Sequence, residues 1–258
     1  MTGAAGYMAL VLAEAVAGSL VFLWCTPLWG EVKHGFFTLT TGVVLLLALT
    51  AWWSAAVGAV PDVDAGLWSV RLALATAVLA GVTLILMLAG RGTIARITGL
   101  LSVPASLAVL VAMAGTGRQS MLLSLFQLLA GAAFLGSITD GLLLGHWYLT
   151  DRGLGRGPIN RLTNAMLIAV PVEAVALVTS GFGGIETSTS LNPLLTAGAL
   201  APWIALGMVG TTLLIAVLTR AALRGERASA VQSATGFYYL AVVTAFTAEV
   251  AVKTRFLG

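Results

Sequence analysis

The chain has 258 residues, of which 59% are hydrophobic and only 9% charged, and its mean hydropathy is +1.01. A soluble domain carries about a quarter charged residues, so this composition excludes a globular fold with a water-exposed surface. Long, uninterrupted apolar runs predict an all-α integral membrane protein, because the strands of a membrane barrel would alternate apolar and polar residues. The net charge of +3 comes without any basic run, which excludes nucleic acid as an expected partner.

Eight segments of the chain are long and apolar enough to cross a bilayer, which takes about 20 residues each. They cover approximately residues 5–28, 35–60, 67–90, 97–115, 120–149, 159–180, 193–218 and 230–252. No basic residues precede the first segment, so we expect a first span and not a cleaved signal peptide. The sequence therefore predicts one polytopic membrane domain over residues 1–258, in the cell membrane and, in a bacterium, in the inner membrane.

The basic residues predict the orientation of these spans. Nine of the 13 lysines and arginines follow odd-numbered spans: Lys33, Arg91, Arg96, Arg152, Arg156, Arg161, Arg220, Arg224 and Arg227. The positive-inside rule places these turns in the cytoplasm and both termini outside. Lys253 and Arg255 weigh against this orientation, because they would form part of a short tail on the outer side.

The first and fifth spans show a weak internal sequence similarity. Gly18 and Ser19 follow Glu14 in the first span, and Gly136 and Ser137 precede Asp140 in the fifth. Such a similarity is consistent with a four-plus-four helix duplication, with halves 1–117 and 118–258.

Four carboxylates lie within the predicted spans, namely Glu14, Asp140, Glu173 and Glu249. An ionisable group inside a bilayer costs about 2.5–3.5 kcal/mol on insertion scales, so each needs a partner, a proton or water. Arg71, near the start of the third span, is the expected partner. The functional interpretation of Glu14, Arg71, Glu173 and Glu249 is a proton path. The structural interpretation is an arginine–glutamate pair that fixes helix packing, with Glu249 simply close to the outer interface.

The residues His146, Trp147 and Tyr148 form a candidate quinone or ligand site at the end of the fifth span. A histidine hydrogen-bonds a carbonyl and exchanges its proton near neutral pH, while tyrosine donates a second bond and tryptophan stacks on a ring. Asp140 could serve this site through water or a neighbouring helix. The alternative is an interfacial aromatic belt, which favours the same residue types.

The two histidines, His34 and His146, both lie near cytoplasmic span ends, at a depth compatible with the axial ligands of one haem b. One cysteine, Cys25, excludes a disulfide within the chain and any cysteine-held cluster, and no metal site is expected. In the turn after the fifth span, Arg152, Arg156 and Arg161 are candidates for contact with anionic lipid headgroups or a partner protein.

Three functions remain open at this point. The first is a membrane subunit of an electron-transfer complex that touches quinone near the cytoplasmic face, with redox centres on partner subunits. The second is a proton-coupled transporter or channel that uses the intramembrane carboxylates. The third is a structural or assembly subunit without chemistry of its own.

Overall fold

The fold is known from a computed structural model, which describes all residues except 30–31, 60–63, 152, 180–192, 226–228 and 258. In order along the chain the helices are α1 (Gly3–Cys25), the short 3-10 helix η1 (Thr26–Trp29), α2 (His34–Gly58), α3 (Asp64–Leu88), α4 (Gly92–Ala114), α5 (Met121–Thr150), α6 (Gly157–Thr179), α7 (Pro193–Ala222) and α8 (Ser229–Phe256). Each of the eight α-helices is long and apolar enough to cross a membrane. The all-α fold and the count of eight spans are therefore confirmed.

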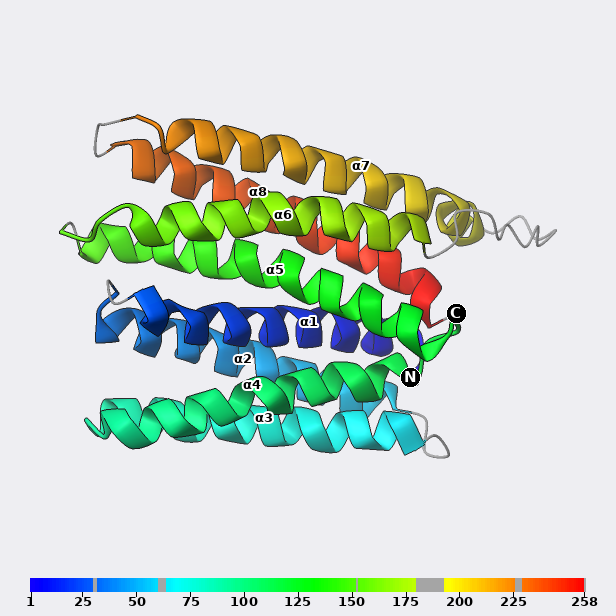
Figure 1. Cartoon of the computed structure of the whole chain (residues 1–258). Helices are drawn as coiled ribbons and strands as arrows, with labels where there is room; N and C mark the ends of the chain where they lie inside the picture. Colours follow the sequence, from blue (N-terminus) through cyan, green and yellow to red (C-terminus); the bar gives the residue numbers. More distant parts are fainter. Residues whose placement is uncertain (30–31, 60–63, 152, 180–192, 226–228, 258) are drawn as a thin grey trace.

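The helices run alternately up and down, so that both chain termini lie at the same end of the bundle (Figure 1). We call this end, where α1 starts and α8 finishes, the terminus end. The opposite end, where α5 finishes at Thr150, is called the His146 end. Which end faces the cytoplasm remains a prediction from the basic residues.

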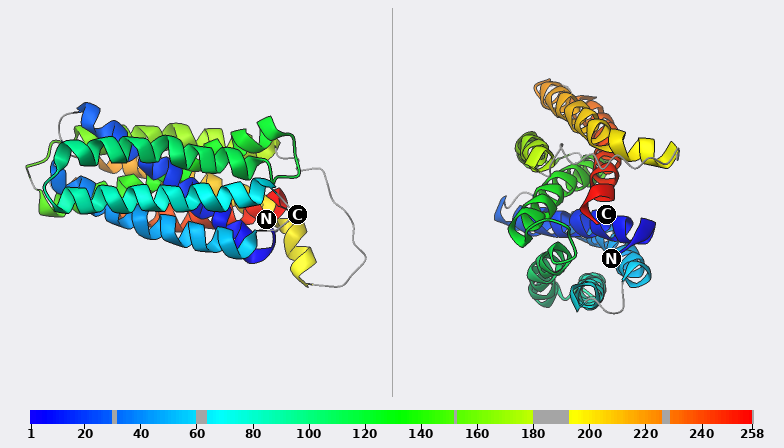
Figure 2. Two further views of the ribbon diagram at one scale, coloured as in Figure 1. Left: turned by 90° about the horizontal axis from the view of Figure 1, so that it is seen from below. Right: turned by 90° about the vertical axis from the view of Figure 1, so that its right-hand side faces the viewer.

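The helices form two groups of four, α1–α4 and α5–α8, which lie beside each other (Figures 1 and 2). Within the first group α1 packs against α2 and α4, and within the second α5 packs against α6 and α8. The groups meet mainly where α1 contacts α5, and the contacts of α1 with α8 and of α4 with α5 flank that seam. In each group the first helix thus packs against the second and the fourth, as a duplication would produce. The duplication itself remains a prediction.

At the centre of the bundle the backbones of α1 and α5 touch. A Cβ atom on Gly18 would lie 1.8 Å from the carbonyl oxygen of Ala132, and one on Gly136 would lie 2.2 Å from the carbonyl carbon of Gly18. Helices in lipid associate through small residues that allow this close approach. The crossing makes α1 and α5 the most buried spans, and it joins the two glycine–serine pairs that echo each other in the sequence.

Candidate functional site

A lysine and three glutamates meet inside the bundle near the terminus end. The Nζ atom of Lys253, on α8, lies 2.6 Å from Oε1 of Glu14 and 3.0 Å from Oε2 of Glu249. Glu173, on α6, is an electrostatic neighbour of Glu249, Lys253 and Glu14. All four side chains are buried, at no more than 1% exposure. We call these residues the acid–lysine cluster.

The direction of each helix explains why these side chains meet. Side chains lean toward the N-terminus of their own helix. Because α8 ends at the terminus end, Lys253 leans inward from its last turn, whereas α1 starts there and Glu14 leans back toward the same level. Gly131, on α5, leaves the space that Glu14 fills, since a Cβ at this position would lie 2.6 Å from Oε1 of Glu14.

The position of Lys253 corrects two expectations from the sequence. It is not part of an external tail, because α8 continues through Phe256 and the lysine side chain has 0% exposure. Glu249 is not simply a carboxylate near the outer interface, because its side chain is fully buried and contacts Lys253; its depth in the membrane remains a prediction. The four-residue spacing of Glu249 and Lys253 was a signal in the sequence, since such residues lie on one helix face.

Arg71, the expected partner of the carboxylates, lies elsewhere. Its guanidinium carbon sits 5.3 Å from the ring centre of Trp68, one turn earlier on α3, and the side chain is exposed. The structure thus brings together three of the four predicted proton-path residues, and Lys253 takes the place expected for Arg71.

The charge balance of the acid–lysine cluster determines its chemistry. With all three carboxyls ionised, one ammonium would leave two net negative charges in a fully buried site. Buried charge without compensation is strongly unfavourable, so the cluster approaches neutrality only when carboxyls hold protons. The arrangement is therefore suited to taking up and releasing protons beside a fixed positive charge.

Asp140 forms a second buried acidic position farther along α5. The side chain has 0% exposure, and Ser19 of α1 is a polar neighbour. It lies four residues beyond Gly136, on the His146 side of the α1–α5 crossing, whereas Glu14 lies four residues before Gly18, on the terminus side. The two acidic positions therefore lie on opposite sides of the crossing, at the seam between the helix groups.

Other hydroxyl groups lie along α5 between the level of Asp140 and the His146 end. The ring of Tyr238, on α8, packs against Gly141, which follows Asp140, and its hydroxyl lies 2.9 Å from Oγ1 of Thr163 on α6. One turn farther along α5, Thr235 of α8 packs against Gly145.

The last polar group along α5 is His146, whose Nε2 forms a hydrogen bond with the hydroxyl of Tyr239. We call this succession the polar row. Its members are the acid–lysine cluster, Asp140 with Ser19, Tyr238 with Thr163, Thr235, and His146 with Tyr239. The row follows α5 from the terminus end to the His146 end.

Of the predicted quinone-binding residues, His146 and Tyr148 form hydrogen bonds within the protein, whereas the buried Nε1 of Trp147 and the carboxylate of Asp140 have no hydrogen-bond partner among the described residues. The Nδ1 atom of His146 lies 3.1 Å from the carbonyl oxygen of Leu142, and its Nε2 faces Tyr239. The ring of Trp147 covers Gly35, at the start of α2. The hydroxyl of Tyr148 donates a hydrogen bond to the carbonyl oxygen of Gly155, which closes the turn after α5.

The two histidines lie at the same end but point to different surroundings. Gly35 and Trp147, their neighbours in the chain, are in contact, so the two histidines sit at a similar depth. His34 lies near Thr38 and borders a pocket, whereas His146 is hydrogen-bonded to Tyr239. Among the described residues the two imidazoles do not contact each other, and a shared haem stays a prediction.

One of the arginines after α5, Arg156, takes part in the structure of the turns. Arg156 donates a hydrogen bond to the carbonyl oxygen of Gly225, in the turn between α7 and α8. Arg161 is likewise engaged by a neighbouring group, and Arg152 lies outside the described residues. In this way Arg156 ties together two turns at the His146 end.

No protein-family model, curated protein or solved structure matches this chain. The function must therefore be argued from the site alone.

Proposed function

We propose that the protein transfers protons across the membrane along the polar row. The observation that carries the proposal is the acid–lysine cluster, in which three glutamates from three helices surround one buried lysine. Intramembrane ionisable groups are costly to insert, so such clusters typically mark proton or ion pathways. Purely structural packing would need only one carboxylate for one lysine.

The other members of the row extend this proposal toward the opposite face. Glu14 and Asp140 are separated by eight helical positions about the crossing, roughly 12 Å along the helix axes. A proton would cross this interval by way of the Ser19 hydroxyl and intervening water. From Asp140 it would pass the hydroxyls of Tyr238 and Thr163 to His146, whose imidazole can accept a proton on one ring nitrogen and release one from the other.

Purified protein in vesicles that contain a pH-sensitive dye tests the proposal. When a potassium diffusion potential is imposed, the pH of the lumen should change faster in vesicles that contain the wild-type protein than in empty vesicles. Glu14→Gln and Asp140→Asn keep the side-chain shape but remove the ionisable group, and each should slow the transfer at least tenfold. Thr212 has a buried hydroxyl between α7 and α8, outside the polar row, so Thr212→Val should leave the rate of proton transfer unchanged. A wild-type rate equal to that of empty vesicles contradicts the proposal.

A quinone-linked membrane subunit of an electron-transfer complex is a second candidate, favoured by the pair of His146 and Tyr239. An imidazole and a phenol in contact at the end of the row could exchange a proton with a quinone at the membrane surface. Such a subunit would depend on partner chains that carry the redox centres. Mild-detergent purification should then recover oxidoreductase partners, and His146→Ala should abolish quinone-linked electron transfer. A chain that purifies alone and transfers no protons would instead favour a structural subunit.

A further inference from the structure

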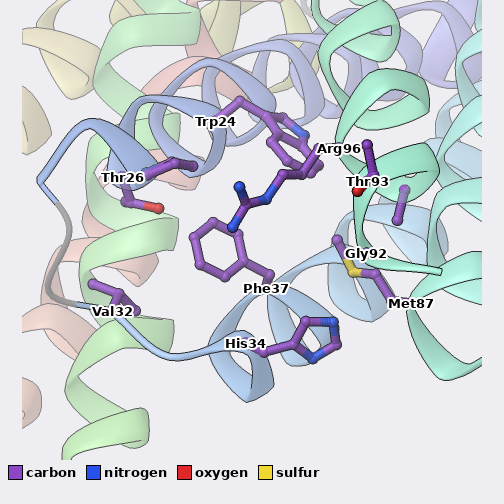
Figure 3. A pocket seen from close by; sticks show the side chains of 11 residues that line it. Trp24, Thr26, Val32, His34, Phe37, Met87, Gly92, Thr93 and Arg96 are labelled. Atoms are coloured by element: carbon purple, nitrogen blue, oxygen red, sulfur yellow. The ribbon is translucent and has the colours of Figure 1, made fainter. Parts of the chain in front are cut away.

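A pocket of about 490 Å³ opens at the His146 end, on the side of the α1–α4 group. The end of α1, the start of α2 and the turn between α3 and α4 form its walls (Figure 3). It contains no member of the polar row. The pocket therefore supports an inference that does not rest on the proposed proton transfer.

The polar lining of the pocket is suited to an anion. The guanidinium of Arg96 projects into it near Trp24 and Phe37, and the imidazole of His34 borders the same space (Figure 3). The part of the lining that the structure describes includes neither aspartate nor glutamate. No described residue hydrogen-bonds or ion-pairs with Arg96, whose exposed guanidinium brings five N–H donors to the pocket lining.

The first turn of α4 adds further donors. Gly92 and Thr93, which open the helix, line the pocket, and the preceding residue Arg91 provides no side-chain cap. The first backbone N–H groups of a helix lack intrahelical partners and carry a partial positive charge. The pocket lining thus includes two kinds of hydrogen-bond donor that favour phosphate, the Arg96 guanidinium and the first N–H groups of α4.

The other walls of the pocket are apolar and firmly held. The ring of Trp24 rests on the backbone of α4, because a Cβ on Gly99 would lie 1.7 Å from that ring. The rings of Trp24 and Phe37 have centroids 6.0 Å apart, and Met87 closes the side toward α3. A free phosphate would leave these apolar walls unused, whereas a phosphate attached to an apolar body would cover them.

We propose that this pocket binds the phosphate of an anionic phospholipid, with Arg96, His34 and the first turn of α4 around the headgroup. The level of the pocket supports this ligand, because helix ends lie in the headgroup region of a bilayer. Basic pockets between transmembrane helices on the cytoplasmic side are known to bind such headgroups, and the basic turns predict this end to be cytoplasmic.

Native mass spectrometry of the delipidated protein tests the site with phosphatidylglycerol and phosphatidylcholine as probes. Wild-type protein should retain phosphatidylglycerol at least tenfold more strongly than phosphatidylcholine. Arg96→Gln should remove most of this preference, because an exposed arginine at the pocket can be replaced without disturbing the core. Arg71 is an exposed arginine at the opposite end of α3, so Arg71→Gln should preserve the preference for phosphatidylglycerol.

The outcomes separate the sources of the phosphate. Equal retention of the two lipids by the wild-type protein would overturn the proposal, and so would full preference in Arg96→Gln. If the protein retains no lipid but binds glycerol 3-phosphate at millimolar concentration, the site belongs to a soluble phosphate compound. That result would overturn the proposal of a phospholipid ligand. Arg96-dependent binding of a neutral quinone in place of either phosphate would overturn the anion site as a whole.

Discussion

At the scale of single residues, Lys253 is the group on which the acid–lysine cluster depends. Removing one member of a buried ion pair leaves the other charge uncompensated, which costs about 3–5 kcal/mol. Lys253→Met should therefore lower the free energy of unfolding by about this amount and lower the melting temperature in detergent. Adding Glu14→Gln and Glu249→Gln to Lys253→Met should recover part of the loss, because fewer carboxyls then lack a counter-charge.

Lys33 provides a matched control for this prediction. Its Nζ atom lies 3.0 Å from Oδ1 of Asp151, but the lysine side chain is 71% exposed. Exposed ion pairs contribute about 0–1 kcal/mol, so Lys33→Met should change the melting temperature only slightly. Equal effects of Lys253→Met and Lys33→Met would contradict a charge-dependent role for the buried lysine.

Residue types inside the spans made part of the site predictable. Glu14, Glu173 and Glu249 stand out in the sequence because a carboxylate in an apolar segment needs a reason to be there. Lys253 was missed because a lysine near a helix end ordinarily extends toward the headgroups. It turns inward only because carboxyls from α1 and α6 lie at that level, and this tertiary arrangement leaves no local pattern.

At the scale of helices, the crossing of α1 and α5 positions Glu14 relative to Asp140. Gly136→Ala would place a Cβ 2.2 Å from the backbone of Gly18, so the two helices must move apart. We expect a loss of stability of about 1–3 kcal/mol from such overpacking, with slower proton transfer because the polar row is disturbed. Thermal unfolding and the vesicle assay measure the two effects.

Gly207→Ala in α7 is the corresponding control, because a Cβ at Gly207 meets no atom within 4 Å. Alanine has a higher helix propensity than glycine, so this variant should be neutral or slightly more stable. A Gly136→Ala variant with wild-type stability and transfer would mean that the close crossing does not position the row.

The helices themselves were readily predicted, whereas their partners were not. Hydropathy alone reveals eight spans because each must match the thickness of the bilayer. Which faces pack together depends on small residues, since lipid tails are as apolar as leucine and the hydrophobic effect does not select a face. The sequence contains 30 glycines, and only the structure distinguishes the crossing glycines Gly18 and Gly136 from those such as Gly207.

At the scale of the whole molecule, orientation decides what the polar row and the pocket face. The acid–lysine cluster lies near the terminus end, and the pocket with Arg96 lies at the His146 end. The predicted orientation places the cluster toward the outside, where it would exchange protons with the outer solution, and the pocket in the cytoplasmic leaflet, which is rich in anionic lipid. The opposite orientation would exchange these two environments.

Single cysteines at the two ends of α8 test this orientation. Cys25→Ser removes the native thiol, and Thr254→Cys or Ser229→Cys then places one exposed thiol at the terminus end or at the His146 end. A membrane-impermeant maleimide should label Thr254→Cys in intact cells and Ser229→Cys only after the membrane is opened, because the nine basic residues hold the His146 end inside. The reverse labelling pattern would mean that the termini face the cytoplasm. The positive-inside rule would then fail for this protein, even though the buried Lys253 no longer counts as a basic residue of the tail. In that case the cluster would take its protons from the cytoplasm, and the proposed lipid of the pocket would belong to the outer leaflet.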